Sequence, residues 1–213
     1  MWALVNNAGV MVFGEFEWST NDLTERQLEV NLLGTLNVTK EFCPLLRKHK
    51  GRVITVTSHC ALATLPGLSV YGATKAALQA WSDGLRVEMR KYGVGVVTFV
   101  PGSFVLQSNI MAQHAANVAE MRDDFTDEQL AFYGDYFDRY NAYLSGLSGE
   151  KPLSKIDDPA LYETFEGALT DLHPKARYIN ENFRYIMYHI LFRFFPTSVR
   201  DYFVVKFMRM PEY

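Results

Sequence analysis

The chain has 213 residues, of which 48% are hydrophobic and 21% are charged, and its formal net charge is −3. This composition is ordinary for one globular domain with a sizeable core, and it argues against a nucleic-acid-binding surface, which would be basic. The only two cysteines, Cys43 and Cys60, show no metal-ligand spacing, so we expect free thiols and neither a disulfide framework nor a metal site.

The first predicted element is a short buried strand over residues 2–5, followed by Asn-Asn-Ala-Gly at residues 6–9. Asn and Gly tolerate tight and left-handed backbone, so this segment predicts a turn. A long helical pattern follows over residues 20–48, with a capping-box match that begins at Thr24. Asn31 interrupts its apolar stripe, and an asparagine beside a core must find hydrogen-bond partners if it is buried.

The next strand and helix bring three chemically useful side chains together. Residues 52–57 form a β-branched run typical of a buried strand, and Ser58 follows at its C-terminal end, where open α/β sheets bind ligands. Tyr71 and Lys75 are four residues apart in a helical pattern, so their Cβ atoms lie about 5–6 Å apart on one face. A lysine this close favours the phenolate, so we expect Lys75 to lower the pKa of Tyr71 below ~10. Tyr71 would then exchange a proton with an alcohol or a carbonyl, and Ser58 would bind the same oxygen.

Residues 93–100 predict a further parallel strand, which ends in Pro101-Gly102. Near-continuous apolar strands that alternate with helices indicate the α/β class with a doubly wound, Rossmann-like parallel sheet. His59 directly follows Ser58, but adjacent residues at a strand end point to opposite faces. We therefore interpret His59 as part of the pocket rim and not as the partner of Ser58.

Residues 103–150 form a polar, aromatic-rich insertion, in which we expect one amphipathic helix after a capping box at Thr126 and Gln129. Its aromatic side chains are more often core packing than substrate contacts. Residues 160–172 then predict a helix, and residues 176–179 predict the last strand.

The tail, residues 180–213, mixes aromatic and aliphatic residues with basic ones, and Pro196 is expected to divide it into two short helices. It has no uncharged apolar run long enough to cross a bilayer. Basic residues among aromatics over residues 183–209 are typical of helices that bind at a membrane surface, so we expect peripheral, salt-sensitive membrane association. The alternative is that the tail packs over a substrate pocket or a subunit interface.

These motifs, in this order, resemble the short-chain dehydrogenase/reductase family. The resemblance covers residues 1–105 strongly and 155–180 weakly, and the segment from Tyr71 onward is most similar to the branch of 3-hydroxybutyrate, retinol and hydroxysteroid dehydrogenases. It implies an oxidoreductase that uses NAD or NADP to interconvert a secondary alcohol and a ketone. It also implies a small hydrophobic or hydroxy-acid substrate, no nucleic-acid partner, and a homo-oligomer when complete. An intracellular location follows, with a mitochondrial or endoplasmic reticulum membrane as the site of contact.

The resemblance implies a role for each site residue. Tyr71 would be the acid/base, Lys75 would bind the nicotinamide ribose, Ser58 would position the substrate oxygen, and Asn31 would hold a relay water. The implied cofactor-binding residues are Asn7, Ala8, Gly9, Tyr71, Lys75, Pro101 and Gly102. The insertion 103–150 corresponds to the variable substrate lid of the family. Leu106 and Gln107 depart from the family pattern where a threonine often binds the carboxamide, so the nicotinamide contact stays open.

The nucleotide-binding part of such a fold is missing from the sequence. A glycine-rich turn and the residue that selects NAD or NADP should lie in two βα units before residue 2. We therefore expect one partial Rossmann-type domain that lacks its first two βα units, as a fragment or shortened product of a complete enzyme. The alternative function is that of a non-catalytic remnant, which acts as a subunit or a binding partner.

Overall fold

A four-stranded parallel sheet lies at the centre of the computed structural model, which describes residues 1–102, 108–148, 156–180 and 183–213. The strands are β1 (Ala3–Asn6), β2 (Arg52–Val56), β3 (Gly95–Val100) and β4 (Arg177–Ile179), and they pair in this order. All pairs are parallel, with Val53 opposite both Leu4 and Val96. The carboxyl ends of the strands therefore lie at one edge, where the site residues were predicted to gather.

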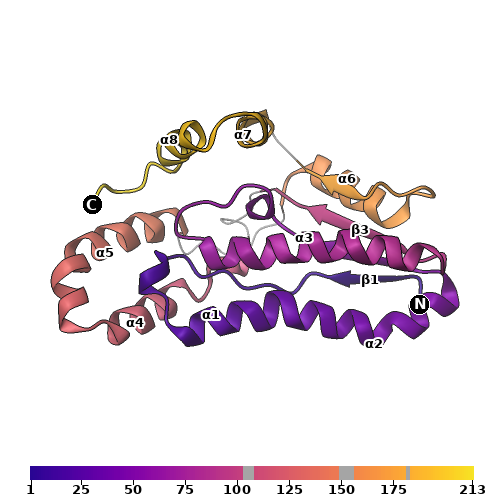
Figure 1. Cartoon of the computed structure of the whole chain (residues 1–213), viewed down its shortest axis with the longest axis horizontal. Helices are drawn as coiled ribbons and strands as arrows, with labels where there is room; N and C mark the ends of the chain where they lie inside the picture. The colour runs from indigo at the N-terminus through magenta and orange to yellow at the C-terminus, as the bar shows by residue number, and fades with distance from the viewer. Residues whose placement is uncertain (103–107, 149–155, 181–182) are drawn as a thin grey trace.

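Helices cover both faces of the sheet, as Figure 1 shows. On one face, α2 (Gly34–His49) and α3 (Ser69–Arg90) pack on Val53 and Val96, and α1 (Asn21–Gln27) packs against α3. On the other face, α6 (Pro159–Thr170) packs on Ile54 and Val97, because successive strand residues point to opposite faces. The predicted α/β class with a Rossmann-like parallel sheet is confirmed.

The long helix predicted over residues 20–48 consists of three parts. Its N-cap is Thr20, whose side chain accepts a hydrogen bond from Leu23 N at 3.1 Å, and Thr24 lies inside α1. The capping box predicted at Thr24 is therefore wrong, because only Thr20 has the extended backbone that an N-cap requires. Between α1 and α2, Leu28–Leu33 form a π-helical turn that contains Asn31.

The described part of the insertion, residues 108–148, contains two α-helices where one was expected, α4 (His114–Asp124) and α5 (Asp127–Ser148). The capping box at its second helix is confirmed, because Thr126 N donates to Gln129 Oε1 at 3.0 Å and Gln129 N donates to Thr126 Oγ1 at 3.2 Å. Trp18 anchors α5, since four aromatic rings of that helix surround it with centroids 5.0–5.8 Å away. These rings belong to Tyr133, Tyr136, Phe137 and Tyr140.

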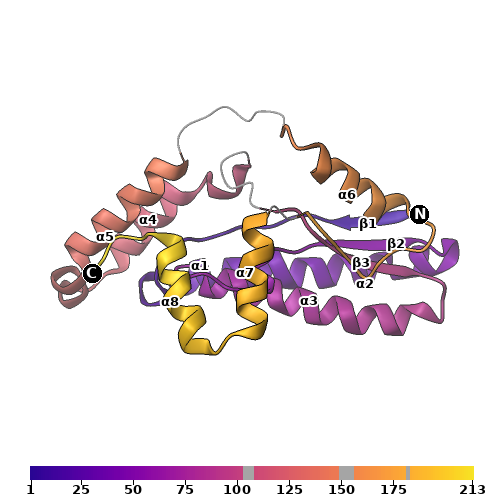
Figure 2. The ribbon, with the colours of Figure 1, turned by 90° about the horizontal axis from the view of Figure 1, so that it is seen from above.

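The tail forms a helical hairpin of α7 (Phe183–Phe194) and α8 (Thr197–Met208), which Pro196 divides as predicted. The hairpin lies on the side of the molecule opposite α2 (Figures 1 and 2). Over the described part of the chain, every helix is too short or too polar to cross a membrane.

Candidate active site

Tyr71 and Lys75 lie in the first two turns of α3, where the chain leaves the loop that follows β2. Both side chains are buried, with 5% and 4% of their surface exposed, and Lys75 Nζ lies 5.8 Å from the centroid of the Tyr71 ring. Gly72 permits this arrangement, because a Cβ at that position would collide with the side chain of Thr64 in the same loop. The loop can therefore pack directly against the start of α3.

Ser58 follows β2 and begins the short 3-10 turn η3 (His59–Ala61). Its Oγ accepts a hydrogen bond from Cys60 N at 3.1 Å, which fixes the direction of the side chain. The Ser58 side chain also lies close enough to the Tyr71 hydroxyl to lower the pKa of the phenol. Ser58, Tyr71 and Lys75 thus form one continuous polar cluster at the carboxyl end of β2.

The ammonium group of Lys75 joins this cluster to the loop after β1. Its Nζ donates to Val56 O at 3.1 Å. A Cβ added to Gly9 would lie 3.4 Å from Lys75 Nζ and 3.5 Å from Asn31 Oδ1, so the three residues meet at one point. The glycine keeps this point open beside a buried cation.

Asn31 is fully buried, and its side chain hydrogen-bonds the loop that follows β1. Its side chain accepts from Val10 N at 2.8 Å and donates to Val10 O at 2.9 Å and to Thr74 Oγ1 at 3.1 Å. Thr74 in turn donates to Tyr71 O at 2.7 Å. The partners that a buried asparagine requires are therefore the loop after β1 and the first turns of α3.

The electrostatic outcome differs from the prediction that Lys75 lowers the pKa of Tyr71. Burial raises the pKa of Tyr71 to about 12, the neighbouring Cys60 raises it as well, and the Ser58 side chain opposes them. Burial also lowers the pKa of Lys75 to about 8. The loss of water around both side chains therefore outweighs the attraction that their spacing suggested.

The predicted cofactor-binding residues lie at the same edge of the sheet. Asn7, Ala8 and Gly9 are exposed just after β1. Pro101 follows β3, and its carbonyl accepts from Asn180 Nδ2 at 3.1 Å, while Gly102 has a φ of +101° that favours glycine. Leu106 and Gln107 lie outside the described residues.

A small pocket of about 50 Å³ opens between the loop after β1 and the start of the insertion. Gly9, Val10 and Val12 line one wall, and Asn109 and Asn117 line the other. The pocket thus adjoins Gly9.

Three residues around the site were not predicted from the sequence, because their partners are remote in sequence. These residues are Asn180, Tyr185 and His189. His59 Nδ1 lies 3.2 Å from His189 Nε2, and its ring stacks on Tyr185 at 4.2 Å, so α7 contacts the residue next to Ser58. Burial, and then His189, lower the pKa of His59 to about 4. Asn180, which joins Pro101 to Asp158 Oδ2, has no signal in the sequence.

Comparison with known proteins agrees with this arrangement. The family model for the short chain dehydrogenases matches residues 1–117. Mitochondrial D-beta-hydroxybutyrate dehydrogenase of Mus musculus is 33% identical over 204 residues, which cover 94% of this chain and 59% of that protein. Retinol dehydrogenase 7 of Rattus norvegicus is 32% identical over 94% of this chain and 62% of its own length, and estradiol 17-beta-dehydrogenase 2 of Mus musculus is 34% identical over 97% and 54%.

Among solved structures, a short-chain dehydrogenase from Streptomyces avermitilis superposes with a TM-score of 0.60 at 23% identity, covering 98% of this chain and 68% of that one. This likeness shows a shared fold. The chain spans about three-fifths of the length of the curated relatives it matches. Since the family model covers more than half of the chain, and the relatives align over almost all of it, the chain belongs to the short-chain dehydrogenase family.

Proposed function

We propose that this chain carries the catalytic residues of an NAD(P)-dependent oxidoreductase that interconverts a secondary alcohol and a ketone. The observation that carries the proposal is that the buried Tyr71 and Lys75 lie beside the partly buried Ser58 at the carboxyl edge of the sheet. The relatives are named as dehydrogenases of D-beta-hydroxybutyrate, retinol and estradiol, and each of these molecules carries a hydroxyl group. We infer a small hydrophobic or hydroxy-acid substrate for the same reason.

Tyr71 is the proton carrier in this proposal. With a pKa of about 12 it is protonated at neutral pH, so it donates its proton to a ketone oxygen in the reductive direction. In the oxidative direction its phenolate takes the proton from the alcohol. Ser58, whose side chain neighbours Tyr71, would donate to the same substrate oxygen. The charge of Lys75 stabilises the phenolate that forms when Tyr71 loses its proton.

The residues around Lys75 fit a nicotinamide cofactor, which supplies the acceptor or donor of a hydride. Lys75 is buried and its ammonium has three N–H groups, one of which donates to Val56 O. The others are available for the hydroxyl groups of a ribose. Gly9 lies beside this ammonium, since a Cβ there would be in van der Waals contact with both Lys75 and Asn31. We propose NAD or NADP, held by Lys75, the loop Asn7–Gly9 and Pro101-Gly102.

Substitution of Tyr71 by Phe in the complete protein tests the proposal. The change removes the proton carrier and preserves the ring, so we expect turnover to fall by a factor on the order of 10²–10⁴. Tyr92→Phe is the matched control, because Tyr92 is half exposed just beyond the other end of α3. Near-normal turnover of Tyr71→Phe, measured by NADH absorbance with a panel of alcohols and ketones, would refute the assignment.

A titration with NADH separates this function from that of a non-catalytic subunit or binding partner. The 213-residue chain is titrated while NADH fluorescence is followed, and folding is verified by circular dichroism. Binding with a micromolar Kd supports the enzyme and contradicts the non-catalytic role. Lys75→Met is expected to weaken binding, because it removes the donors that we assign to the ribose.

A further inference from the structure

Helix α7 has two apolar stripes on opposite sides. The inner stripe consists of Tyr185, Tyr188, His189 and Phe192, at the spacing of one helical face. Tyr185 and His189 contact His59, and Tyr188 is buried in a cluster with Ala63 and Val204. The inner stripe therefore attaches the hairpin to the rim of the candidate active site.

The outer stripe is exposed in the part of the chain that the structure describes. Phe183, Ile186, Met187 and Ile190 repeat at the same spacing, about 180° around the helix from the inner stripe. Their exposed fractions are 76%, 41%, 49% and 42%, so they face away from the protein. An amphipathic helix that only packed against the core would place polar residues here.

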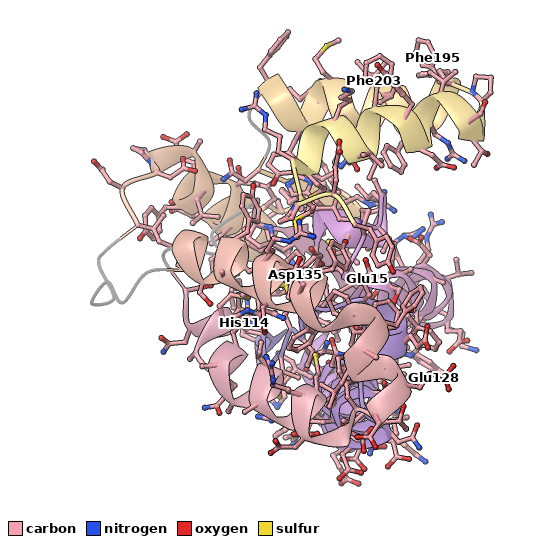
Figure 3. All side chains as sticks on the ribbon, turned by 90° about the vertical axis from the view of Figure 1, so that its left-hand side faces the viewer. Glu15, His114, Glu128, Asp135, Phe195 and Phe203 are labelled. Atoms are coloured by element: carbon pink, nitrogen blue, oxygen red, sulfur yellow. The ribbon has the colours of Figure 1, made fainter. Side chains whose placement is uncertain are left out.

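The turn and α8 extend this exposed surface. Figure 3 shows Phe195 and Phe203 on the outer side of the hairpin, and their exposed fractions are 49% and 47%. Arg200 braces the turn, because it donates to Phe192 O at 3.2 Å and to Thr197 Oγ1 at 2.8 Å. The outer apolar surface, defined as Phe183, Ile186, Met187, Ile190, Phe195, Tyr202, Phe203 and Val205, is therefore presented by a fixed pair of helices.

The charge of the hairpin indicates what this surface contacts. Residues 183–210 contain five arginines or lysines and one aspartate, whereas the whole chain has a net charge of −3. The hairpin is thus positive and the rest of the chain is negative. Lys206 and Arg209 are both exposed, and Lys206 Nζ lies 5.8 Å from the centroid of the Tyr202 ring in the outer apolar surface. Pairing of two such hairpins across a twofold axis would bring like charges together, which opposes a second copy as the occupant.

We propose that the outer apolar surface of the α7–α8 hairpin docks on an anionic lipid bilayer. Each helix has 12 residues, or about 18 Å, which is too short to cross the hydrocarbon core. The hairpin lies flat in the interface instead, with its aromatic side chains among the acyl chains and its basic side chains at the headgroups. Because the inner stripe of α7 contacts His59, the docked bilayer lies on the same side as the candidate active site.

Vesicle co-sedimentation of the intact protein tests this docking. We expect binding to vesicles of phosphatidylcholine with phosphatidylserine, weaker binding to phosphatidylcholine alone, and release as salt rises from about 0.1 M to about 0.5 M. The double substitution Phe195→Ser and Phe203→Ser should lower the partition coefficient about tenfold or more. Val87→Ser is the matched control, because Val87 is 70% exposed on α3, and it should bind like the parent.

Three outcomes would overturn the proposal. The first is that no vesicle sediments the protein, and the second is that both lipid compositions bind it equally at every salt concentration. The third is that the double substitution leaves vesicle binding unchanged but lowers the oligomeric mass in sedimentation velocity, which would make a second copy the occupant. Unchanged thermal unfolding of the double variant verifies that it is folded, as expected for substitutions of exposed residues.

Discussion

Lys75 is the residue at which burial and chemistry conflict most directly. Its ammonium is almost inaccessible to water, and burial lowers its pKa from 10.5 to about 8. Between these two values the unfolded chain binds more protons than the folded one, so the free energy of unfolding rises with pH in this range. Below pH 8 the folded protein carries the full cost of burying the charge.

Lys75→Met therefore tests whether the buried charge is retained for function. We expect the variant to be more stable than the parent at pH 7 by about 1–3 kcal/mol, since loss of the bond to Val56 O offsets part of the gain. This advantage should shrink as pH rises from 8 to 10.5, while activity is lost throughout. Urea unfolding across that pH range measures the stability advantage and its decrease with pH. Lys91→Met is the control, because Lys91 is exposed just beyond α3. A variant less stable at every pH would contradict the account.

At the scale of single elements, the capping box of α1 was predicted at Thr24, one helical turn after the true N-cap, Thr20. Thr20 and Thr24 are both followed by plausible helix sequence, but Thr20 accepts from Leu23 N and also donates to Glu120 Oε1 at 2.6 Å. Thr24 N bonds to Thr20 O as a residue within the helix. The contact with α4 that favours Thr20 is 100 residues away and is invisible in a local pattern.

We expect Thr20→Ala to lower the free energy of unfolding by about 1 kcal/mol, because Leu23 N loses its acceptor. Thr24→Ala should have a smaller effect, since its hydroxyl makes one 3.4 Å contact with Ser19 Oγ. Urea unfolding of both variants gives the comparison. A larger loss for Thr24→Ala would mean that the capping box predicted from the sequence operates after all.

The alternation of strands and helices was predictable because it follows from apolar periodicity and local turn residues. The gathering of Tyr71, Ser58 and Gly9 at one edge of the sheet followed from this alternation. The π-helical turn was not predictable, because it depends on where Asn31 finds its partners, Val10 and Thr74, across the fold. The predicted decrease in the pKa of Tyr71 was wrong for a similar reason, because the residues that bury this side chain come from other parts of the chain.

At the scale of the whole molecule, helix α7 of the C-terminal tail packs against the segment that follows β2. His59 and His189 are in contact at the carboxyl end of the sheet. This pair of imidazoles therefore helps to attach α7 to the rest of the protein. Figure 2 shows α7 passing above the region between α3 and the strands. Burial and His189 lower the pKa of His59 from 6.5 to about 4. Between these values the unfolded chain binds more protons, so stability falls as pH decreases from 6.5 toward 4.

His59→Phe should reduce this acid sensitivity, because a phenyl ring still stacks on Tyr185 but cannot bind a proton. After allowance for screening by solvent, we expect the parent to lose about 1–2 kcal/mol more than the variant between pH 7 and pH 5. Urea unfolding at both pH values measures the difference, and hydrogen exchange of α7 locates it. His49→Phe is the matched control, since His49 is exposed in the last turn of α2 and should leave the pH dependence of the parent unchanged. An equal loss of stability in His59→Phe and the parent would show that the imidazole pair does not make the attachment of the tail sensitive to acid.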